Sequence, residues 1–405
     1  MTAILEGIKV LDLSRIVAGP ACTQTLADMG ATVYKIEKPG EGDDTRRMGP
    51  FLSDPHDAHG AESATYLAYN RGKQSVTIDI ATPEGAALVQ DLAARCDVLV
   101  ENYKVGSLAK YGLDETSIRR RRPDIIYCSI TGFGQTGPYA TRPAYDFILQ
   151  GMAGLMSTCG HPEGAPGAGP MRTAIPITDV VTGLYAAVGI VGALYHRQKT
   201  GQGQYLDASL LDSSVALNGH VALGYLITGK IPPRAGNTNP VASPSEVLDC
   251  ADGSIIVAAG NDGQFKAICE TLGHPEWTRD ERFRTNTLRI AHRAALREIL
   301  APALAGHTRA ELVATFESAG VPCGPINDMA DVFQDEQIRH RDLVVNLPHS
   351  RGVNVPSLRS PLRFSATPVE HRPPPMLGEH SAQVLAAELG LSQERLEELR
   401  ARAVI

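Results

Sequence analysis

The chain has 405 residues, of which 43% are hydrophobic and 20% are charged, with a formal net charge of −7 and a pI near 6.0. This is the composition of a globular protein of two or three domains, and it argues against a nucleic-acid binder, which normally carries a basic domain. No apolar run reaches the roughly 18 residues of a membrane span, and the N-terminus lacks a signal-peptide pattern, so we expect no membrane partner.

Short apolar runs alternate with helical patterns through the first half of the chain, which predicts βαβ units and a mainly parallel sheet. The predicted strands cover residues 10–13, 32–36, 75–80, 97–100, 125–130 and 205–208. The predicted helices cover residues 20–29, 83–95, about 108–111, 179–196 and a segment from 209. The helix from 179 is rich in Gly and Ala, so we expect it to be buried or to lie at an interface.

A change in composition after Gly229 marks a linker, because five Pro, Arg and Gly residues follow between positions 232 and 240. Beyond the linker the pattern becomes α+β, with a hairpin over 246–258 followed by helices. A Pro-rich stretch at 372–375 precedes a last helix from Ser381. We therefore predict a large α/β domain (1–228), a smaller α+β domain (229–328) and a C-terminal segment (329–405) that packs back on the large domain.

Cysteines and histidines show no pattern of a metal or disulfide site. The seven cysteines are scattered without a C-x-x-C pair, and none of the twelve histidines lies in H-E-x-x-H. Such cysteines are typical of reduced thiols in a cytoplasmic protein. The sequence therefore predicts a cytoplasmic location and no metal site. Cys22, at a helix start, is expected to be a buried apolar residue rather than an activated thiol.

Asp179 follows the Pro-punctuated loop through Pro170 and Pro176 and begins a long apolar helix. A carboxylate held there by backbone N–H groups and the positive helix end stays ionised and can act as a nucleophile. For Asp179 alone, helix capping is the favoured interpretation. Tyr145 and Asp146 begin another helical pattern, where Asp146 either orients a reacting group or only favours the helix dipole.

Residues 132–137 fit G-x-G-x-x-G after a predicted strand. A dinucleotide site also needs a helix at those glycines and an acidic residue about 20 positions later, at the end of a second strand. Here, Pro138 and Pro143 interrupt the segment that follows the motif, where that helix would have to form. The motif therefore predicts a loop that shapes a pocket rather than a site for NAD.

Basic residues follow several predicted strands of this half. Ligands of open α/β sheets bind beyond the carboxyl ends of the strands, and the turn 15–20 enters a helix there. Each basic residue alone is expected at the surface, but together they fit a phosphate-rich ligand. They are Arg15, Lys38, Arg71, Lys73, Lys104 and Lys110.

An ordered set of short motifs extends the pattern. They include Ala18-Gly19-Pro20, Asn70-Arg71-Gly72-Lys73, Glu101-Asn102-Tyr103, Gly132-Phe133-Gly134-Gln135-Thr136-Gly137-Pro138, Thr178-Asp179 with Thr182-Gly183, and Lys199-Thr200-Gly201-Gln202-Gly203. With them the chain resembles a class III (CaiB/BaiF-type) CoA-transferase over nearly its whole length. The resemblance implies an α/β fold with a large Rossmann-like parallel-sheet domain, a smaller α+β domain and an interlocked homodimer.

Within this superfamily the chain is most similar to dicarboxylate CoA-transferases of the succinate–hydroxymethylglutarate group. The related α-methylacyl-CoA racemases carry His-Asp where this chain has Tyr145-Asp146, and that His is one of their two bases. A tyrosine is a poor general base near pH 7, because its unperturbed pKa is about 10. A racemase or epimerase, and a non-catalytic acyl-CoA-binding relative, are the alternatives to the transferase.

The resemblance also implies roles for individual residues. Asp179 is the nucleophile, Tyr145 and Asp146 are candidate orienting residues, and Gly132 and Gly134 form an oxyanion loop. Arg47, Arg172 and Arg234 are candidates for binding the far carboxylate of the substrate. The implied CoA-binding residues are Arg15, Ile16, Val17, Ala18, Lys38, Arg71, Lys73, Asn102, Tyr103 and Lys110.

The implied reaction moves CoA from an acyl-CoA, such as succinyl-CoA or a similar short dicarboxylyl-CoA, to an acceptor carboxylate. It passes through an aspartyl mixed anhydride and an aspartyl–CoA thioester. The expected partners are an acyl-CoA and a small carboxylic acid, and no cofactor beyond CoA or acyl-CoA as substrate is expected.

Overall fold

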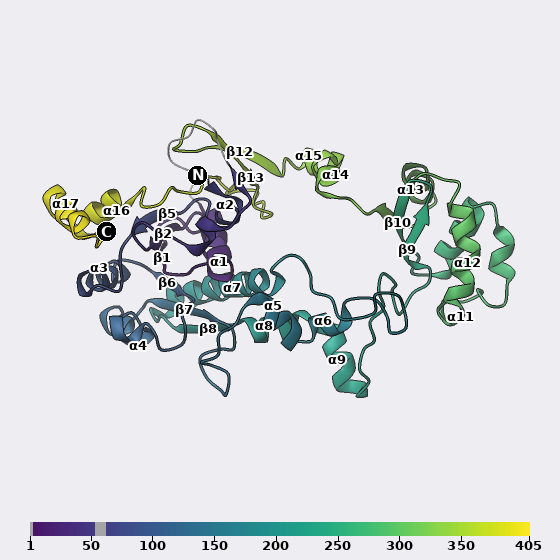
Figure 1. The fold of residues 1–405 in the computed structure, drawn as a ribbon, viewed down its shortest axis with the longest axis horizontal. Coiled ribbons are helices and arrows are strands. Elements are labelled where there is room, and N and C mark those ends of the chain that lie inside the picture. Colours follow the sequence, from purple (N-terminus) through teal and green to yellow (C-terminus); the bar gives the residue numbers. More distant parts are fainter. Residues whose placement is uncertain (1–2, 53–61) are drawn as a thin grey trace. The chain divides into compact units, whose positions relative to one another are not determined.

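The computed structural model describes residues 3–52 and 62–405 (Figure 1). Within them the chain divides into two compact units. The larger unit consists of Met1–Leu155, Arg172–Lys230 and Arg341–Ile405, and the smaller unit of Met156–Met171 and Ile231–His340. The smaller unit therefore includes residues 156–171 and 329–340, which the sequence analysis assigned to the large domain and to the C-terminal segment. Composition alone gave no sign that a loop before Asp179 belongs to this unit.

A six-stranded sheet with every pairing parallel forms the centre of the larger unit, which confirms the predicted α/β class. Its order is β5-β2-β1-β6-β7-β8, so the chain leaves one side of β1 after β5 and returns on the other side as β6. The carboxyl ends of β1 and β6 therefore flank a topological switch point, where open sheets bind ligands. The strands are β1 (Lys9–Asp12), β2 (Thr32–Glu37), β5 (Gln74–Thr77), β6 (Val98–Glu101), β7 (Ile126–Thr131) and β8 (Tyr205–Ser209).

One face of this sheet is covered by α1 (Ala18–Asp28), α5 (Asp146–Met152), α7 (Ile177–Thr200) and α8 (Leu210–Leu217). Helix α1 packs directly on α7, because a Cβ on Gly183 would lie 2.5 Å from the carbonyl oxygen of Ala18. Cys22 is fully buried between them, and burial raises the pKa of its thiol, as expected for a packed apolar residue.

The opposite face is covered by α3, α4 and the two C-terminal helices. Helix α3 begins as predicted, because Pro83 occupies its first turn and the Thr82 side chain accepts a hydrogen bond from the N–H of Gly85. The C-terminal segment returns to the sheet, where the N–H of Asp79 donates to the carbonyl of Val404 at 2.8 Å. These helices are α3 (Pro83–Ala93), α4 (Glu115–Arg121), α16 (Ser381–Leu389) and α17 (Gln393–Ala401).

Shorter elements complete the larger unit. The segment predicted as a helix near 108–111 is a single 3₁₀ turn, Ala109–Tyr111, which ends at Gly112 with a φ of 63°. The other elements are a 3₁₀ turn at Asp44–Arg47, α2 (Ala64–Tyr69), α9 (Gly219–Thr228) and the two-stranded sheets β3 (Phe51–Leu52) with β4 (Glu62–Ser63) and β12 (Val344–Pro348) with β13 (Asn354–Leu358). The chain passes from the larger to the smaller unit within α6 (Leu155–Thr158), after Leu155.

The smaller unit has its own core around an antiparallel sheet of order β11-β10-β9. The predicted hairpin is present as β9 (Ser245–Cys250) and β10 (Gly253–Ala258), and β11 is Cys323–Pro325. Around it lie α10 (Asp262–Thr271), a 3₁₀ turn (Pro275–Arg279), α11 (Asn286–Ala291), α12 (Arg293–Leu304) and α13 (Arg309–Ser318). The short helices α14 (Met329–Gln334) and α15 (Glu336–His340) also belong to this unit but lie away from the sheet (Figure 1).

Helix α7 corrects one expectation. Its 24 residues include an 18-residue window of mean hydropathy 1.7, which is long and apolar enough to cross a membrane by length and composition. The bent pair α8 and α9, at 77°, passes the same test together. The run was missed because Thr, Tyr and Gly residues interrupt it. Core helices of globular proteins also pass this test, and α7 buries Gly183, Ile190 and Ala193 in the larger unit.

Candidate active site

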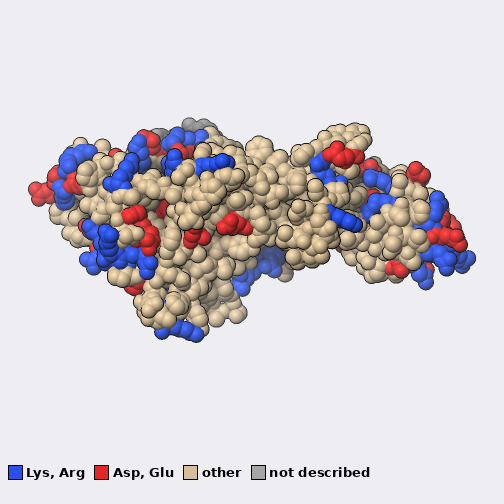
Figure 2. Space-filling view, turned by 90° about the horizontal axis from the view of Figure 1, so that it is seen from below, with Lys and Arg blue, Asp and Glu red and all other residues tan. Residues whose placement is uncertain are grey.

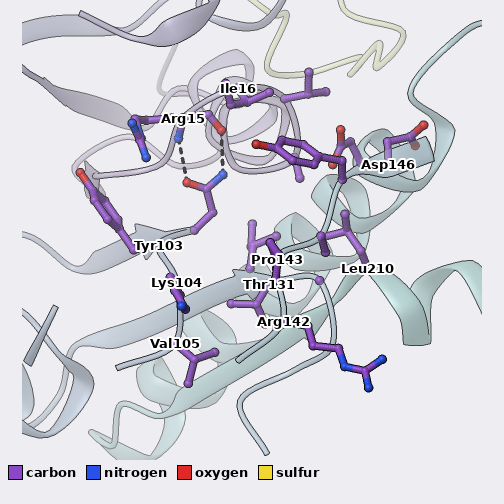
Figure 3. A pocket seen from close by; sticks show the side chains of 18 of the residues that line it. Arg15, Ile16, Tyr103, Lys104, Val105, Thr131, Arg142, Pro143, Asp146 and Leu210 are labelled. Carbon is purple, nitrogen blue, oxygen red and sulfur yellow. Dashed lines mark hydrogen bonds between the residues drawn. The ribbon is translucent and has the colours of Figure 1, made fainter. Parts of the chain in front are cut away.

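A cavity of about 340 Å³ opens beyond the carboxyl ends of β1, β6 and β7, beside the switch point (Figure 3). It brings together residues from several separate parts of the sequence. Those predicted from the sequence are Arg15, Ile16, Val17, Ala18, Asn102, Tyr103, Gly132, Tyr145, Asp146 and Asp179. The cavity therefore joins the predicted nucleophile to six of the ten predicted CoA-binding residues.

Asp179 lies in the first turn of α7 and lines this cavity. Burial raises the pKa of its carboxyl to about 7, and the negative charge of Asp146 adds to this effect. From the sequence we expect the opposite, an ionised carboxylate held by backbone N–H groups. In the described part of the chain the carboxyl of Asp179 accepts no hydrogen bond from the helix start, so desolvation decides its protonation.

The helix start is instead capped by Asp146. Its Oδ1 accepts a hydrogen bond from the N–H of Thr178 at 2.8 Å and another from the Thr178 hydroxyl, and its Oδ2 accepts one from Nε2 of Gln150 at 2.6 Å. Asp146 also occupies the first turn of its own helix, α5. Asp146 therefore occupies the first turn of one helix and caps the start of another, while a role in orienting a reacting group stays a prediction.

Tyr145 precedes α5 and has 71% of its surface exposed, although it lines the cavity. Such a phenol is able to contact a bound ligand without first leaving a packed position. Its neighbour in the cavity wall, the loop after β7, is held by Asp207, whose Oδ2 accepts a hydrogen bond from the N–H of Gln135 at 2.9 Å.

The two glycines of the predicted oxyanion loop take different positions. Gly132 lines the cavity, and a Cβ there would lie 2.0 Å from the Cβ of Ala144, so only glycine fits. Gly134 has a φ of 81° and faces Asp207, so it shapes the loop without lining the cavity. Of these two glycines, only Gly132 therefore lines the same cavity as Asp179.

A second cavity, of about 330 Å³, lies against the first and shares Arg15, Asp44 and Tyr103 with it. The predicted CoA-binding residues Lys38 and Lys110 line this second cavity and are exposed. Lys38 pairs with Glu41, and the ammonium of Lys110 lies 4.6 Å from the centre of the Tyr111 ring. An extended ligand with an anionic end would place that end beside these two lysines.

Arg71 and Lys73 do not fit their predicted role. Both are buried, and both already have anionic partners: Nε of Arg71 donates to Oδ1 of Asp28 at 2.9 Å, and Nζ of Lys73 lies 3.1 Å from Oδ2 of Asp12. Burial lowers the pKa of Lys73 to about 8 in spite of that carboxylate. These cations neutralise buried carboxylates instead of meeting a ligand, because a charge inside the protein needs a partner.

Several cavity residues escaped the site prediction. The cations Lys104 and Arg142 line the first cavity, although Figure 3 shows the guanidinium of Arg142 extending away from the other labelled residues. Thr131 lines it with a buried hydroxyl that has no hydrogen-bond partner in the described residues. Tyr69 of α2 is coupled to the site, because burial and the charge of Asp179 raise the pKa of its phenol. Only Lys104 had a sequence signal, its place after a strand.

The three arginines predicted to bind a far carboxylate are engaged elsewhere. Arg47 pairs with Asp44 at 2.9 Å, and the guanidinium of Arg172 lies 4.9 Å from the centre of the Phe147 ring. Arg234 belongs to the smaller unit, where its Nε donates to the carbonyl of His161 at 3.0 Å. Neither Arg47 nor Arg172 lines the cavity of Asp179. Within the described residues, no group of three His, Cys, Asp or Glu side chains is arranged to hold a metal ion.

Comparison with known proteins gives a consistent family. The model of CoA-transferase family III matches residues 5–381. The succinate–glutarate CoA-transferase of Agrobacterium fabrum is 46% identical over 94% of this chain and 95% of that protein, and the succinyl-CoA:glutarate CoA-transferase of Homo sapiens is 40% identical over 99% and 90%. The crystal structure of a CaiB/BaiF family protein from Brucella suis has a TM-score of 0.87 and 44% identity, covering 96% of this chain and 100% of that one.

Proposed function

The chain belongs to CoA-transferase family III, and from this premise we propose that it moves CoA from a short dicarboxylyl-CoA, such as succinyl-CoA, to a dicarboxylate such as glutarate through Asp179. The observation that carries the proposal is that Asp179, the turn after β1 and the residues after β6 line one cavity. A carboxyl there meets a thioester and an acid in turn, and relatives named for succinate and glutarate support dicarboxylic substrates.

The reaction starts when the Asp179 carboxylate attacks the thioester carbonyl, which breaks the C–S bond and gives a mixed anhydride and CoA thiolate. The thiolate then attacks the aspartyl carbonyl, which releases the donor acid and leaves an aspartyl–CoA thioester. The acceptor carboxylate attacks that thioester to give a second anhydride and thiolate. Attack of the thiolate on the acceptor acyl carbon yields the new CoA thioester and restores the Asp179 carboxylate.

The surroundings of Asp179 match the needs of this sequence. A carboxylate is a weak nucleophile in water, so removal of water and fixed geometry must supply most of the acceleration. Burial, which raises the pKa of Asp179 to about 7, also strips the carboxylate of solvent. Asp146 fixes the first turn of α7 through Thr178, and the N–H groups near Gly132 are candidates for stabilising the oxyanion. Each step exchanges bonds of similar energy, so we propose that no further cofactor takes part.

For CoA itself we propose a path along the two adjoining cavities. The thioester end lies in the cavity of Asp179, and the phosphates lie beside Lys38 and Lys110 in the second cavity. Arg15 and Tyr103 line both cavities, and the guanidinium of Arg15 lies 5.2 Å from the centre of the Tyr103 ring. The pair therefore marks the point that the pantetheine chain would pass.

For the far carboxylate of the acid we propose Lys104 and Arg142 in place of the three arginines named from the sequence. Arg15 also lines the cavity, but it pairs with Asp44 at 3.1 Å. Lys104 and Arg142 have no ion pair within the described residues, and the Arg142 guanidinium lies 3.8 Å from the centre of the Tyr139 ring. An Arg142→Gln variant should raise KM for glutarate more than KM for butyrate, which lacks the second carboxylate.

We further propose that the protein is a cytoplasmic homodimer. Figure 2 shows stretches of surface without charged side chains on the larger unit, beside its charged areas. The larger unit also exposes large apolar side chains on several helices, including Phe147 on α5, Val188 on α7, and Leu226 and Ile227 on α9. An exposed apolar surface of this kind is typical of an interface. Light scattering coupled to gel filtration should give twice the chain mass of 43.2 kDa.

The experiment that tests the function is covalent trapping. Wild-type protein and an Asp179→Asn variant are incubated with succinyl-CoA, trapped with hydroxylamine or borohydride, and digested for mass spectrometry. We expect modification of the peptide carrying Asp179 in the wild type, none in the variant, and glutaryl-CoA formation only by the wild type. Glu84→Gln, a first-turn carboxyl of α3 on the opposite sheet face, is the matched control and should keep both signals.

Other results would overturn the proposal. A folded Asp179→Asn variant that forms glutaryl-CoA at the wild-type rate would exclude the aspartyl intermediate. Exchange of the α-proton of an acyl-CoA in deuterated water, without any adduct or transfer, would favour the epimerase. Tight CoA binding with neither reaction would favour a binding protein.

A further inference from the structure

The turn between β1 and α1 contains a strained residue. Ile16 has a φ of 71°, in the left-handed region that a β-branched side chain strongly disfavours. Such conformations persist only where the surrounding structure fixes them, and they gather at functional sites. Ile16 lines the cavity of Asp179, and it is the only non-glycine residue of that lining with a positive φ in the described chain.

Asn102 holds Arg15, the residue before Ile16. The N–H of Arg15 donates to Oδ1 of Asn102 at 2.9 Å, and Nδ2 of Asn102 donates to the carbonyl of Arg15 at 2.7 Å, as the dashed lines in Figure 3 show. This reciprocal pair joins the loop after β1 to the loop after β6, across the switch point of the sheet.

Asp43 holds Ile16 itself. The N–H of Ile16 donates to both carboxylate oxygens of Asp43, each at 3.3 Å. Oδ2 of Asp43 also lies 2.8 Å from Nζ of Lys35, and both of these side chains are fully buried. Burial alone would raise the pKa of Asp43, but Lys35 and Thr45 outweigh it and lower this pKa to about 2. The carboxylate is therefore charged at every physiological pH, and it is fully engaged.

The same network reaches one residue further back. Nζ of Lys35 donates to the carbonyl of Ser14 at 3.0 Å, and the N–H of Ser14 donates to Oδ1 of Asp12 at 2.9 Å. Every backbone donor and acceptor from the Ser14 N–H to the Ile16 N–H is thus satisfied by a side chain. The partners come from β1, β2, the loop after β2 and the loop after β6, so the turn has little freedom to relax.

We infer that Asp43 is a positioning residue, which holds the strained turn at Ile16 so that Arg15 lies where the two cavities meet and thereby sets the affinity for CoA thioesters. Asp43 borders the second cavity but is only 1% exposed, so we assign its effect to the backbone of Ile16, whose N–H donates to it, and not to direct contact with the ligand. The inference rests on the proposed function, because it assigns the two adjoining cavities to one CoA molecule. It assigns Asp43 no part in the chemistry at Asp179.

The first test is Asp43→Asn, which keeps the shape of the side chain but loses the charge. We expect the Kd for CoA and the KM for succinyl-CoA to rise on the order of tenfold or more, with kcat within about a factor of two, because the turn shifts while Asp179 stays in place. Asp28→Asn is the matched control: it disrupts another buried ion pair of the larger unit, with Arg71, and should lower thermal stability without changing the Kd.

The second test separates positioning from general stability. Glycine adopts a positive φ without strain, whereas alanine does not. Ile16→Gly combined with Asp43→Asn should therefore recover most of the lost CoA affinity, while Ile16→Ala with Asp43→Asn should not. Both double variants remove the Ile16 side chain, so the difference between them reports on the backbone alone.

The outcomes are distinct. An unchanged Kd in a folded Asp43→Asn variant, a loss confined to kcat, or equal recovery by glycine and alanine would overturn the inference. If Asp43→Asn does not fold, Asn102→Ala removes the other restraint without leaving a buried charge and should show the same rise in Kd and the same selective recovery by Ile16→Gly. A wild-type protein that binds CoA but transfers nothing would refute the proposed function, while the Kd comparisons would still decide the role of Asp43.

Discussion

Asp146 caps the helix that carries Asp179. Its Oδ1 accepts the hydrogen bond of the Thr178 N–H at 2.8 Å, a role that the sequence suggested for Asp179 itself. Among the described residues, none donates to Asp179 a hydrogen bond that would lower its pKa, and the charge of Asp146 adds to the effect of burial. One carboxylate fixes the geometry of the site while the other keeps a pKa near neutrality, where small changes in surroundings alter its charge.

The pH dependence of transfer should report this arrangement. Because the nucleophile is the ionised form, we expect kcat/KM to rise with pH through a midpoint of about 7 and then to level off. Asp146→Asn retains an acceptor for the Thr178 N–H but removes the like charge, so the midpoint should move to lower pH. Steady-state rates with succinyl-CoA from pH 5 to 9 measure it. Asp91→Asn on α3 is the control, and an unchanged or higher midpoint for Asp146→Asn would contradict the assignment.

The free energy of unfolding should also depend on the protonation of Asp179, but it should fall with rising pH, whereas the rate of transfer should rise. Burial raises the pKa of Asp179 from 3.8 to about 7, so the folded state favours the neutral carboxyl. Its contribution to the free energy of unfolding is therefore fully present below about pH 4 and is lost as the pH rises through about 7. Asp179→Asn removes this loss, so the variant should equal the wild type near pH 4 and exceed it by on the order of a few kcal/mol at pH 8. Urea unfolding at both pH values measures the difference, and a gap independent of pH would contradict it.

Two cations that the sequence placed in the CoA site should now behave differently. Arg71→Met leaves the carboxylate of Asp28 buried without a partner and should destabilise the fold by about 3–5 kcal/mol, with no change in the Kd for CoA. Lys110→Met removes an exposed cation of the second cavity and should weaken CoA binding roughly tenfold with little effect on the melting temperature. Thermal melts and calorimetric titration with CoA test both variants, and a Kd that rises in Arg71→Met would restore its predicted role.

The contact between α1 and α7 gives a matched pair of glycine substitutions. In Gly183→Ala the new Cβ would lie 2.5 Å from a backbone oxygen, so the two helices must separate, and we expect a loss of about 1–3 kcal/mol and a lower kcat. Gly192 is in the same helix with nothing within 4 Å, so Gly192→Ala should stabilise the protein by up to about 1 kcal/mol and leave kcat unchanged. Equal effects of the two substitutions would show that the close contact does not matter.

The sequence predicted the sheet well and the buried charges poorly. The strands from Lys9 to Ser209 were found within a few residues, because apolar runs between turns and the Pro at the start of α3 are local signals. Six of the ten predicted CoA-binding residues lie in one cavity with Asp179, because parallel strands bring their carboxyl ends to one edge. The family resemblance to CoA-transferases was confirmed over residues 5–381.

The predictions that failed concern residues whose partners lie far away in the sequence. Nothing near Lys73 in the chain reveals that Asp12, on a different strand, neutralises it. Asp146 caps a helix that begins 31 positions later, and this cap follows from the packing of α5 against α7. The strained conformation of Ile16 likewise depends on a residue distant in the sequence, Asp43. Such long-range pairs decide which charges remain free for a ligand, so the site residues were less predictable than the fold.

The reciprocal bonds between Arg15 and Asn102 have a consequence for how this enzyme diversifies. They join the loops after β1 and β6 at Arg15, a residue that lines both cavities. In the arrangement that we propose, different side chains recognise the nucleotide and the acid. A lineage is therefore free to exchange one acid for another by substitutions around Lys104 and Arg142 while its hold on the common carrier stays intact, which makes substrate range the property that we expect to change most readily in evolution.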